Sequence, residues 1–385
     1  MSVFSQSRNI QRLRWLAVGL AVAGVALQIG APHRPQLVEI LYGQMVYPVL
    51  ARGLRFTSTW LPFSLAELIV GLVIILALAG TGWLLRTMWT QRADWKALVK
   101  TGVVNVLVAG GILLLGFQLC WGLNYSRLPV SQRLALPSHQ ATPAEVKNLC
   151  QFLIAEANRA YAQAQTQTGP KPPGTLALSL DEVRADLEAS FRRATWIGPT
   201  SQGSYSPAKP VFFSPVLSYA GISGVYFPFT SEPNFNADMP GCDLPFTLAH
   251  EMAHQRGFAP EDEANFVAFL ICITAEQPYC QYSGYLLGAR YLMGDACETR
   301  ECTKELLAQF ATGPQADLKA VGAFWARYRG IWQDLSQRVN HTYLRANNVT
   351  AGVGSYNLVV RLITDYYHAD HLADRSSPQN SISHQ

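Results

Sequence analysis

The sequence predicts a mainly α-helical chain with a small β element, in which three transmembrane helices precede one larger domain. Two observations lead to this fold class. Hydrophobic residues make up 49% of the chain and charged residues only 15%, whereas soluble domains carry roughly 25% charged residues. The apolar residues are also concentrated in three runs within the first third of the chain. The low charge is therefore explained by segments that face lipid.

The three apolar runs predict membrane spans at about residues 15–31, 65–86 and 102–123. Each approaches the ~20 residues that a helix needs to cross the hydrocarbon layer. Aromatic residues of the kind found at membrane interfaces lie near their ends: Trp15, Trp60, Trp83, Trp121 and Tyr125. Three such runs within 125 residues disfavour the alternative, buried helices of a soluble core.

Loop charges predict the orientation of a multi-pass protein of the cell (inner) membrane. The amino terminus carries Arg8, Arg12 and Arg14, and the loop after the second run is also basic, so both are expected in the cytoplasm. Three arginines between residues 31 and 64 weaken this asymmetry without reversing it. The basic start also fits a cleaved signal peptide, but no strong Ala-x-Ala site follows, which favours an uncleaved span.

The predicted division is a membrane anchor over 1–125, an extracytoplasmic domain over 126–373 and a disordered tail over 374–385. Thr142 and Ser179 each begin a capping box, which predicts helices from about 143 to 162 and from 180 towards 194. Residues 163–174 are polar and rich in Pro and Gly, so a loop is expected there. A strand is expected around 224–227.

The chemistry of the sequence is concentrated in one motif, His250-Glu251-Met-Ala-His254. Residues four apart share a helix face, so both imidazoles can reach one ion. Glu251 follows the first histidine, where it can act as general base on a metal-activated water. Zinc is the expected ion, because it accepts histidine and carboxylate ligands and keeps a position open. The plainer alternative is a helix with two hydrogen-bonded histidines.

The third ligand is sought just downstream. Gly257 ends the first helix, and Pro260 opens a second one. Glu261 is the expected ligand, with Asn265 on the same face as its supporting residue. Glu263 remains an alternative ligand, and the acidic first turn could also serve only the helix dipole.

HEMAH followed by Glu261-x-x-Ala-Asn265 resembles the zincin metallopeptidases in which two histidines and a downstream glutamate bind zinc. The spacing departs from that pattern, because only six residues separate His254 from Glu261. A wider similarity covers Trp121 to Tyr125, Gly221 to Glu232, the motif region and Tyr282 to Tyr285. These stretches resemble an uncharacterised family of bacterial membrane proteins, domain of unknown function 3810, which is placed among the zincins.

The resemblance and the motif together imply a membrane-anchored zinc peptidase with a peptide or protein substrate. The rivals are a zinc hydrolase of a non-peptide amide, such as a cell-wall component, and a non-enzymatic membrane sensor or scaffold. No basic run indicates a nucleic-acid partner. Six cysteines follow the spans, either as buried thiols or as disulfides, and Cys297 and Cys302 are close enough to close a small loop.

Overall fold

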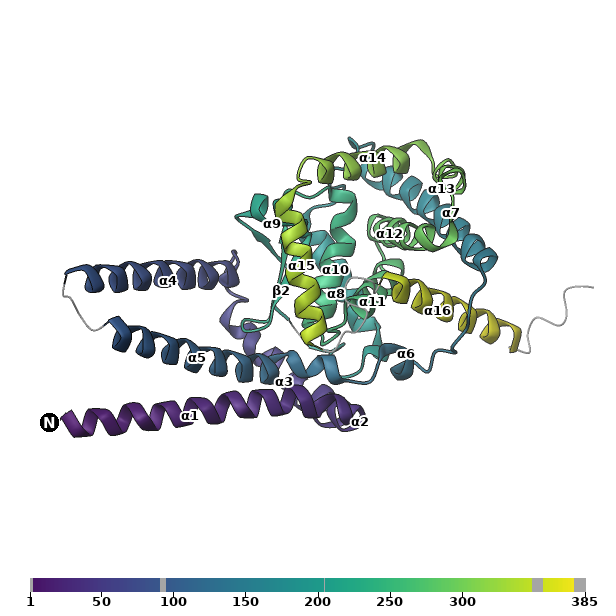
Figure 1. The fold of residues 1–385 in the computed structure, drawn as a ribbon. Helices are drawn as coiled ribbons and strands as arrows, with labels where there is room; N and C mark the ends of the chain where they lie inside the picture. The colour runs from purple at the N-terminus through teal and green to yellow at the C-terminus, as the bar shows by residue number, and fades with distance from the viewer. Residues whose placement is uncertain (1–2, 91–94, 204, 348–355, 377–385) are drawn as a thin grey trace, which may run out of the picture.

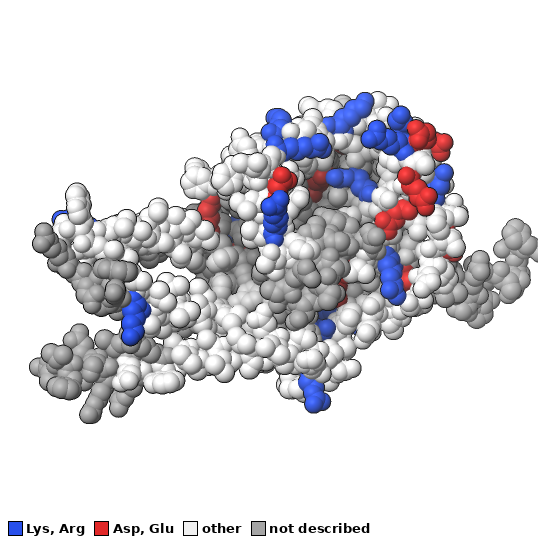
Figure 2. Space-filling model, viewed as in Figure 1, with Lys and Arg blue, Asp and Glu red and all other residues white. Residues whose placement is uncertain are grey.

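A computed structural model describes residues 3–90, 95–203, 205–347 and 356–376 (Figure 1). Three long helices extend from one side of a larger, mostly helical body that carries a three-stranded sheet. On the face shown in Figure 2, charged side chains gather on this body, whereas the long helices are mostly uncharged. The predicted fold class, mainly helical with a small β element, is confirmed.

The three long helices are α1 (Val3–Gly30), α4 (Leu65–Thr90) and α5 (Trp95–Cys120). Their stretches Trp15–His33, Leu65–Thr90 and Gly102–Cys120 are long and apolar enough to cross a membrane. They begin at the residues expected from the sequence. Close packing of α1 on α5 depends on small residues, since a Cβ at Gly111 would lie 2.8 Å from the Cβ of Ala21.

The larger body contains most of the remaining helices: α6 (Val130–Arg133), α7 (Pro143–Thr168), α8 (Leu180–Arg193), α9 (Ser214–Ala220), α10 (Leu244–Gln255), α11 (Glu261–Ile273), α12 (Pro278–Ala296), α13 (Arg300–Leu307), α14 (Thr312–Ala326), α15 (Ile331–Ala346) and α16 (Tyr356–Ser376). Both expected capping boxes are present, at Thr142 and Ser179. The predicted loop from 163 is wrong in its first residues, because α7 continues until Gly169 takes a positive φ. Residues 377–385 of the predicted tail lie outside the described chain.

The segment between the first two spans is helical, which the sequence did not indicate. It contains a π-helix, η2 (Val38–Val46), and α3 (Tyr47–Leu54). Its buried Glu39 accepts two hydrogen bonds from Arg127, at 2.8 and 2.9 Å. Tyr47 is fully buried and reaches the C-terminal end of α10. This segment therefore packs directly against residues that follow the third span.

The sheet has the order β1-β3-β2, so β2 lies at an edge. Its strands are β1 (Lys209–Val211), β2 (Gly224–Phe227) and β3 (Glu232–Asn236). β3 runs parallel to β1 and antiparallel to β2. β2 is the strand expected from the sequence. β2 and β3 both contact α10, which places the edge strand beside the HExxH motif.

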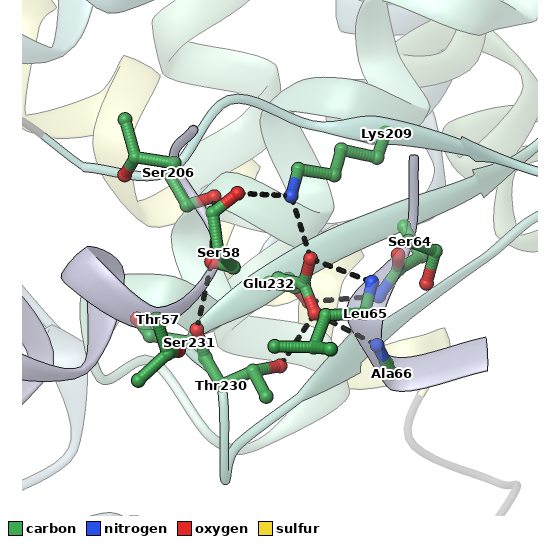
Figure 3. Close-up of polar contacts among 12 residues, drawn as sticks. Thr57, Ser58, Ser64, Leu65, Ala66, Ser206, Lys209, Thr230, Ser231 and Glu232 are labelled. Atoms are coloured by element: carbon green, nitrogen blue, oxygen red, sulfur yellow. Dashed lines mark hydrogen bonds and ion pairs between the residues drawn. The ribbon is translucent and has the colours of Figure 1, made fainter. Parts of the chain in front are cut away.

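A buried ion pair joins the sheet to the start of α4 (Figure 3). The Nζ of Lys209 lies 2.7 Å from the Oε1 of Glu232, and the two side chains are 2% and 0% exposed. Glu232 also accepts hydrogen bonds from the backbone N–H groups of Leu65 and Ala66, at 3.1 and 2.9 Å. These two donors belong to the first turn of α4, where a negative charge is favourable. Glu232 thus caps the second long helix from the middle of the sheet.

We expect Glu232→Gln to lower the free energy of unfolding by about 3 kcal/mol or more, because it leaves the Lys209 ammonium buried without a counter-charge. Chemical unfolding of the full chain in detergent would measure the loss. The double variant Lys209→Met/Glu232→Gln should recover part of it, since neither charge then remains buried. If the double variant were as unstable as the single one, the unpaired charge would not be the cause.

Candidate metal centre

The two motif histidines and Glu261 converge at one point. His250 and His254 stand one turn apart on α10, and the carboxylate of Glu261 comes from the first turn of α11. Its Oε2 lies 3.2 Å from the Nε2 of His250, and its Oε1 lies 3.7 Å from the Nε2 of His254. One potential ligand atom from each of the three residues lies within 4.8 Å of the others. The spacing allows all three to hold one metal ion.

A tight turn between α10 and α11 brings Glu261 back to the histidines. Gly257 has a φ of +87°, a conformation that side chains with a Cβ rarely adopt. A Cβ there would also lie 2.7 Å from a guanidinium nitrogen of Arg127 and 2.8 Å from Oδ1 of Asn124. Arg127 donates to the Gly257 carbonyl at 3.3 Å. Glycine is therefore required both by the backbone and by the residues that follow the third span.

Backbone carbonyls orient His254. Its Nδ1 lies 2.7 Å from the carbonyl oxygen of Phe258. A carbonyl can only accept, so Nδ1 carries the proton, and Nε2 is directed towards Glu261. The sequence motif did not indicate Phe258. Asn265, the expected supporting residue, makes no hydrogen bond to either histidine within the described chain, and the Nδ1 of His250 has no partner there.

Charge and burial have opposite effects on the pKa values of Glu261 and His254. Burial would raise the pKa of Glu261, but the two imidazoles hold it well below its ordinary value. Burial would lower the pKa of His254, but the Glu261 carboxylate and the Phe258 carbonyl raise it to about 9. The Glu261 carboxylate thus favours positive charge beside the two histidines. Two imidazoles and a carboxylate with this preference form a suitable donor set for a divalent cation.

Glu251 is the buried carboxylate of the centre. Its side chain points away from bulk water, with the residue 3% exposed, and its Oε2 has no hydrogen-bond partner among the described residues. Burial raises its pKa to about 7, although the charges of His250 and His254 oppose the rise. A carboxylate with such a pKa can both accept and return a proton near neutral pH.

Gly224, the first residue of β2, packs directly on Glu251. A Cβ at this position would lie 2.5 Å from Oε1 and 2.7 Å from Cγ of Glu251. Only glycine lets the edge strand approach the carboxylate this closely. In the sequence, Gly224 is only a glycine at the start of the expected strand. The reason that a glycine is needed there depends on the packing of β2 against α10.

We expect Gly224→Ala to displace the Glu251 carboxylate while leaving the side chains of His250, His254 and Glu261 in place. A displacement of about 1 Å at a reacting group can reduce a rate by up to about 100-fold. The hydrolytic rate expected of such a metal centre should therefore fall, while the metal content, measured by elemental analysis, should stay unchanged. Gly294→Ala on α12 is a matched control, because a Cβ there would meet no atom within 4 Å. Equal activity of the two variants would contradict the close packing.

Glu263, the alternative ligand, is directed elsewhere. Its Oε1 accepts a hydrogen bond from the backbone N–H of Val130 at 2.9 Å, and its Oε2 lies 3.4 Å from Arg133. The residue is buried. These contacts tie α11 to α6, so Glu263 is engaged away from the histidines, whereas Glu261 faces them.

Two aromatic residues, one from α3 and one from just after α5, hold the end of α10. The hydroxyl of Tyr47 donates to the Gln255 carbonyl at 2.9 Å, and the indole N–H of Trp121 donates to the His254 carbonyl at 3.2 Å. The Trp121 ring also meets the His254 ring edge-on, with centroids 5.8 Å apart. His254 therefore lies close to the end of the third long helix, α5.

The cysteines divide into two kinds. Cys297 and Cys302 form a disulfide. The other four that follow the spans are buried free thiols: Cys150, Cys242, Cys272 and Cys280. Both alternatives raised by the sequence are thus present, in different parts of the chain.

Comparison with protein families gives one match. Residues 42–364 match the family described as protein of unknown function (DUF3810). A search of curated proteins finds no match, and neither does a search of solved structures. The matched range includes α3, the second and third long helices, the sheet and the whole metal centre. Since the match spans most of the chain, this protein belongs to the DUF3810 family.

Proposed function

We propose that the protein is a membrane-anchored zinc metallopeptidase of the zincin type. One observation carries the proposal: His250, His254 and Glu261 converge on one point, with the buried carboxylate of Glu251 beside them. A helix with two satisfied histidines would not require a third ligand at that point. A pure binding module would have no use for a buried carboxylate without a hydrogen-bond partner.

Zinc suits these residues. Two imidazole nitrogens and one carboxylate are a common ligand set for catalytic zinc and leave a coordination position open. When bound, zinc would polarise the scissile carbonyl and activate water for attack. His250, His254 and Glu261 would hold it, and the Phe258 carbonyl would keep His254 in the required orientation.

The chain's own residues supply the rest of the proposed reaction. Glu251 accepts a proton from the attacking water and then returns it to the leaving amine, a role open to a buried carboxylate without a hydrogen-bond partner among the described residues. β2 offers an edge next to this carboxylate, where an extended peptide can add as a further strand. The peptide or protein substrate is therefore expected to run along residues 224–227.

The proposed setting is the cell (inner) membrane, with the metal centre on the extracytoplasmic side. Three helices of suitable length and the arginine-rich amino terminus support this arrangement. The Cys297–Cys302 disulfide supports it too, because disulfides persist in oxidising compartments.

Metal analysis of the full chain, purified in detergent, tests the proposal. We expect about one zinc per chain, and loss of zinc in His250→Ala and His254→Ala, because each removes a ligand. His33→Ala removes an exposed histidine next to the first span and should keep the zinc. Full zinc content in both motif variants would refute the site.

Incubation with a peptide panel and a muropeptide panel then tests the reaction. Cleavage of peptides that depends on zinc is the expected result. Cleavage of muropeptides alone would keep the metal hydrolase and assign a different substrate. Zinc binding without any hydrolysis would favour the sensor or scaffold.

A further inference from the structure

A long uncharged segment runs from the second residue of β1 to the turn after β2. From Pro210 to Ser231 the chain contains no Asp, Glu, Lys or Arg. Within it, Phe212, Phe213 and Val216 are 83%, 60% and 64% exposed. They lie at the start of α9, and we call these three residues the α9 patch. Large exposed apolar side chains grouped in this way usually mark a surface that is covered in the functional protein.

The α9 patch is attached to the first turn of α4. The carboxylate of Glu67 accepts hydrogen bonds from the backbone N–H groups of Phe212 and Phe213, at 2.9 and 2.8 Å. Glu67 is the third residue of the helix that begins the second span. The two phenylalanines are therefore held at the level where α4 enters its apolar stretch. In Figure 1, α9 lies on the side of the body from which α4 extends.

Two further contacts fix the sheet at the same level. The carboxylate of Glu232 accepts the backbone N–H groups of Leu65 and Ala66, which ties β3 to the first turn of α4 (Figure 3). The turn after β2 also reaches the third span, where Phe229 lies within van der Waals distance of a Cβ placed on Gly116. Gly116 is one turn before the end of α5. Both ends of the uncharged segment thus touch helices that are suited to a bilayer.

We propose that the α9 patch is seated in the interfacial layer of the bilayer, at the end of the membrane where α4 begins. The body would then rest on the lipid surface through its own side chains as well as through the spans. Lipid is the occupant indicated by continuity with α4 and by the absence of charge. Phenylalanine rings and a valine gain from leaving water at this depth, whereas a protein partner would usually be met by some polar or charged groups.

The proposal rests on α4 spanning the membrane. One experiment tests the span and the immersion of the α9 patch separately. A nitroxide is attached to Phe212→Cys in the full chain, reconstituted at one chain per phosphatidylcholine nanodisc. Leu76→Cys in the middle of α4 is the membrane reference. Phe152→Cys, an exposed aromatic position on α7, is the aqueous reference. Power saturation compares access of oxygen, which concentrates in the bilayer, with access of a nickel chelate, which stays in water. The labelled unsubstituted chain gives the background from its free cysteines.

We expect the ratio of oxygen access to nickel access at Phe212→Cys to exceed that at Phe152→Cys several-fold and to lie nearer to that at Leu76→Cys. A ratio equal to that of Phe152→Cys, with Leu76→Cys immersed, would overturn the proposal and leave the span intact. Aqueous values at all three positions would show that α4 does not span and would remove the proposal with it. Protection from both reagents would identify another part of the protein as the cover and would overturn the proposal.

Discussion

Glu251→Gln should retain zinc and lose peptide hydrolysis by about 100- to 10,000-fold, the usual contribution of a positioned acid–base group. Glutamine keeps the shape of the side chain but cannot take a proton from water. The amide also carries no charge to be buried, and it replaces a carboxylate whose pKa burial already raises to about 7. The fold should therefore be at least as stable as that of the unsubstituted chain. Turnover of a zinc-loaded sample, normalised to measured metal, is the decisive quantity.

Asp262→Asn makes the same chemical change nearby and serves as the control. Asp262 follows Glu261 on α11 but is not one of the three converging residues. Its variant should keep most of the activity. If Glu251→Gln were as active as Asp262→Asn with zinc bound, another group would have to be the base.

Local patterns made the centre of the site predictable. The spacing of His250 and His254 on one helix, and the position of Glu251 beside them, follow from helical periodicity alone. Gly257 and Pro260 gave the turn that returns the chain, because both residues restrict the backbone in known ways. The prediction of three long apolar helices depended only on composition and length.

Contacts between distant segments were not predictable in the same way. The packing of Gly224 on Glu251 and the hydrogen bond from the His254 Nδ1–H to the Phe258 carbonyl depend on backbone positions, which leave no mark on residue type beyond a glycine. The helical segment with Tyr47 lies between two spans, and it is short. Its role depends on the contact between Tyr47 and the Gln255 carbonyl, and these two residues are 208 positions apart in the sequence.

The buried Lys209–Glu232 pair shows the same limit. A lysine and a glutamate on different strands look like ordinary surface residues in the sequence. Only the parallel pairing of β1 with β3, and the arrival of α4 above them, remove both from water. Once buried, the pair must be matched with hydrogen bonds, which Ser58, Thr230 and the start of α4 supply. Tertiary structure, not local pattern, therefore decides their role.

The two glutamates of α11 should separate cleanly into a metal ligand and a structural anchor. Glu261→Gln should weaken zinc binding by at least about 100-fold, which is the upper end of the loss seen when a supporting residue is removed. Its side chain is 36% exposed and pairs only with the two imidazoles among the described residues, so the free energy of unfolding of the metal-free chain should fall by no more than about 1 kcal/mol.

Glu263→Gln should do the opposite. Its carboxylate is buried and receives the Val130 N–H and the Arg133 guanidinium. Loss of a hydrogen bond to a charged group costs about 2 kcal/mol, so the free energy of unfolding should fall by that amount. Zinc affinity should stay within a few-fold of that of the unsubstituted chain, because the turn at Gly257 between α10 and α11 still brings Glu261 to the histidines. Competition with a chromogenic chelator measures the affinities, and denaturant unfolding of the metal-free chain measures stability. A larger loss of zinc affinity in Glu263→Gln than in Glu261→Gln would reverse the assignment. Because the two side chains point about 200° apart around the helix axis, α11 would then have to turn by that angle to bring Glu263 to the histidines.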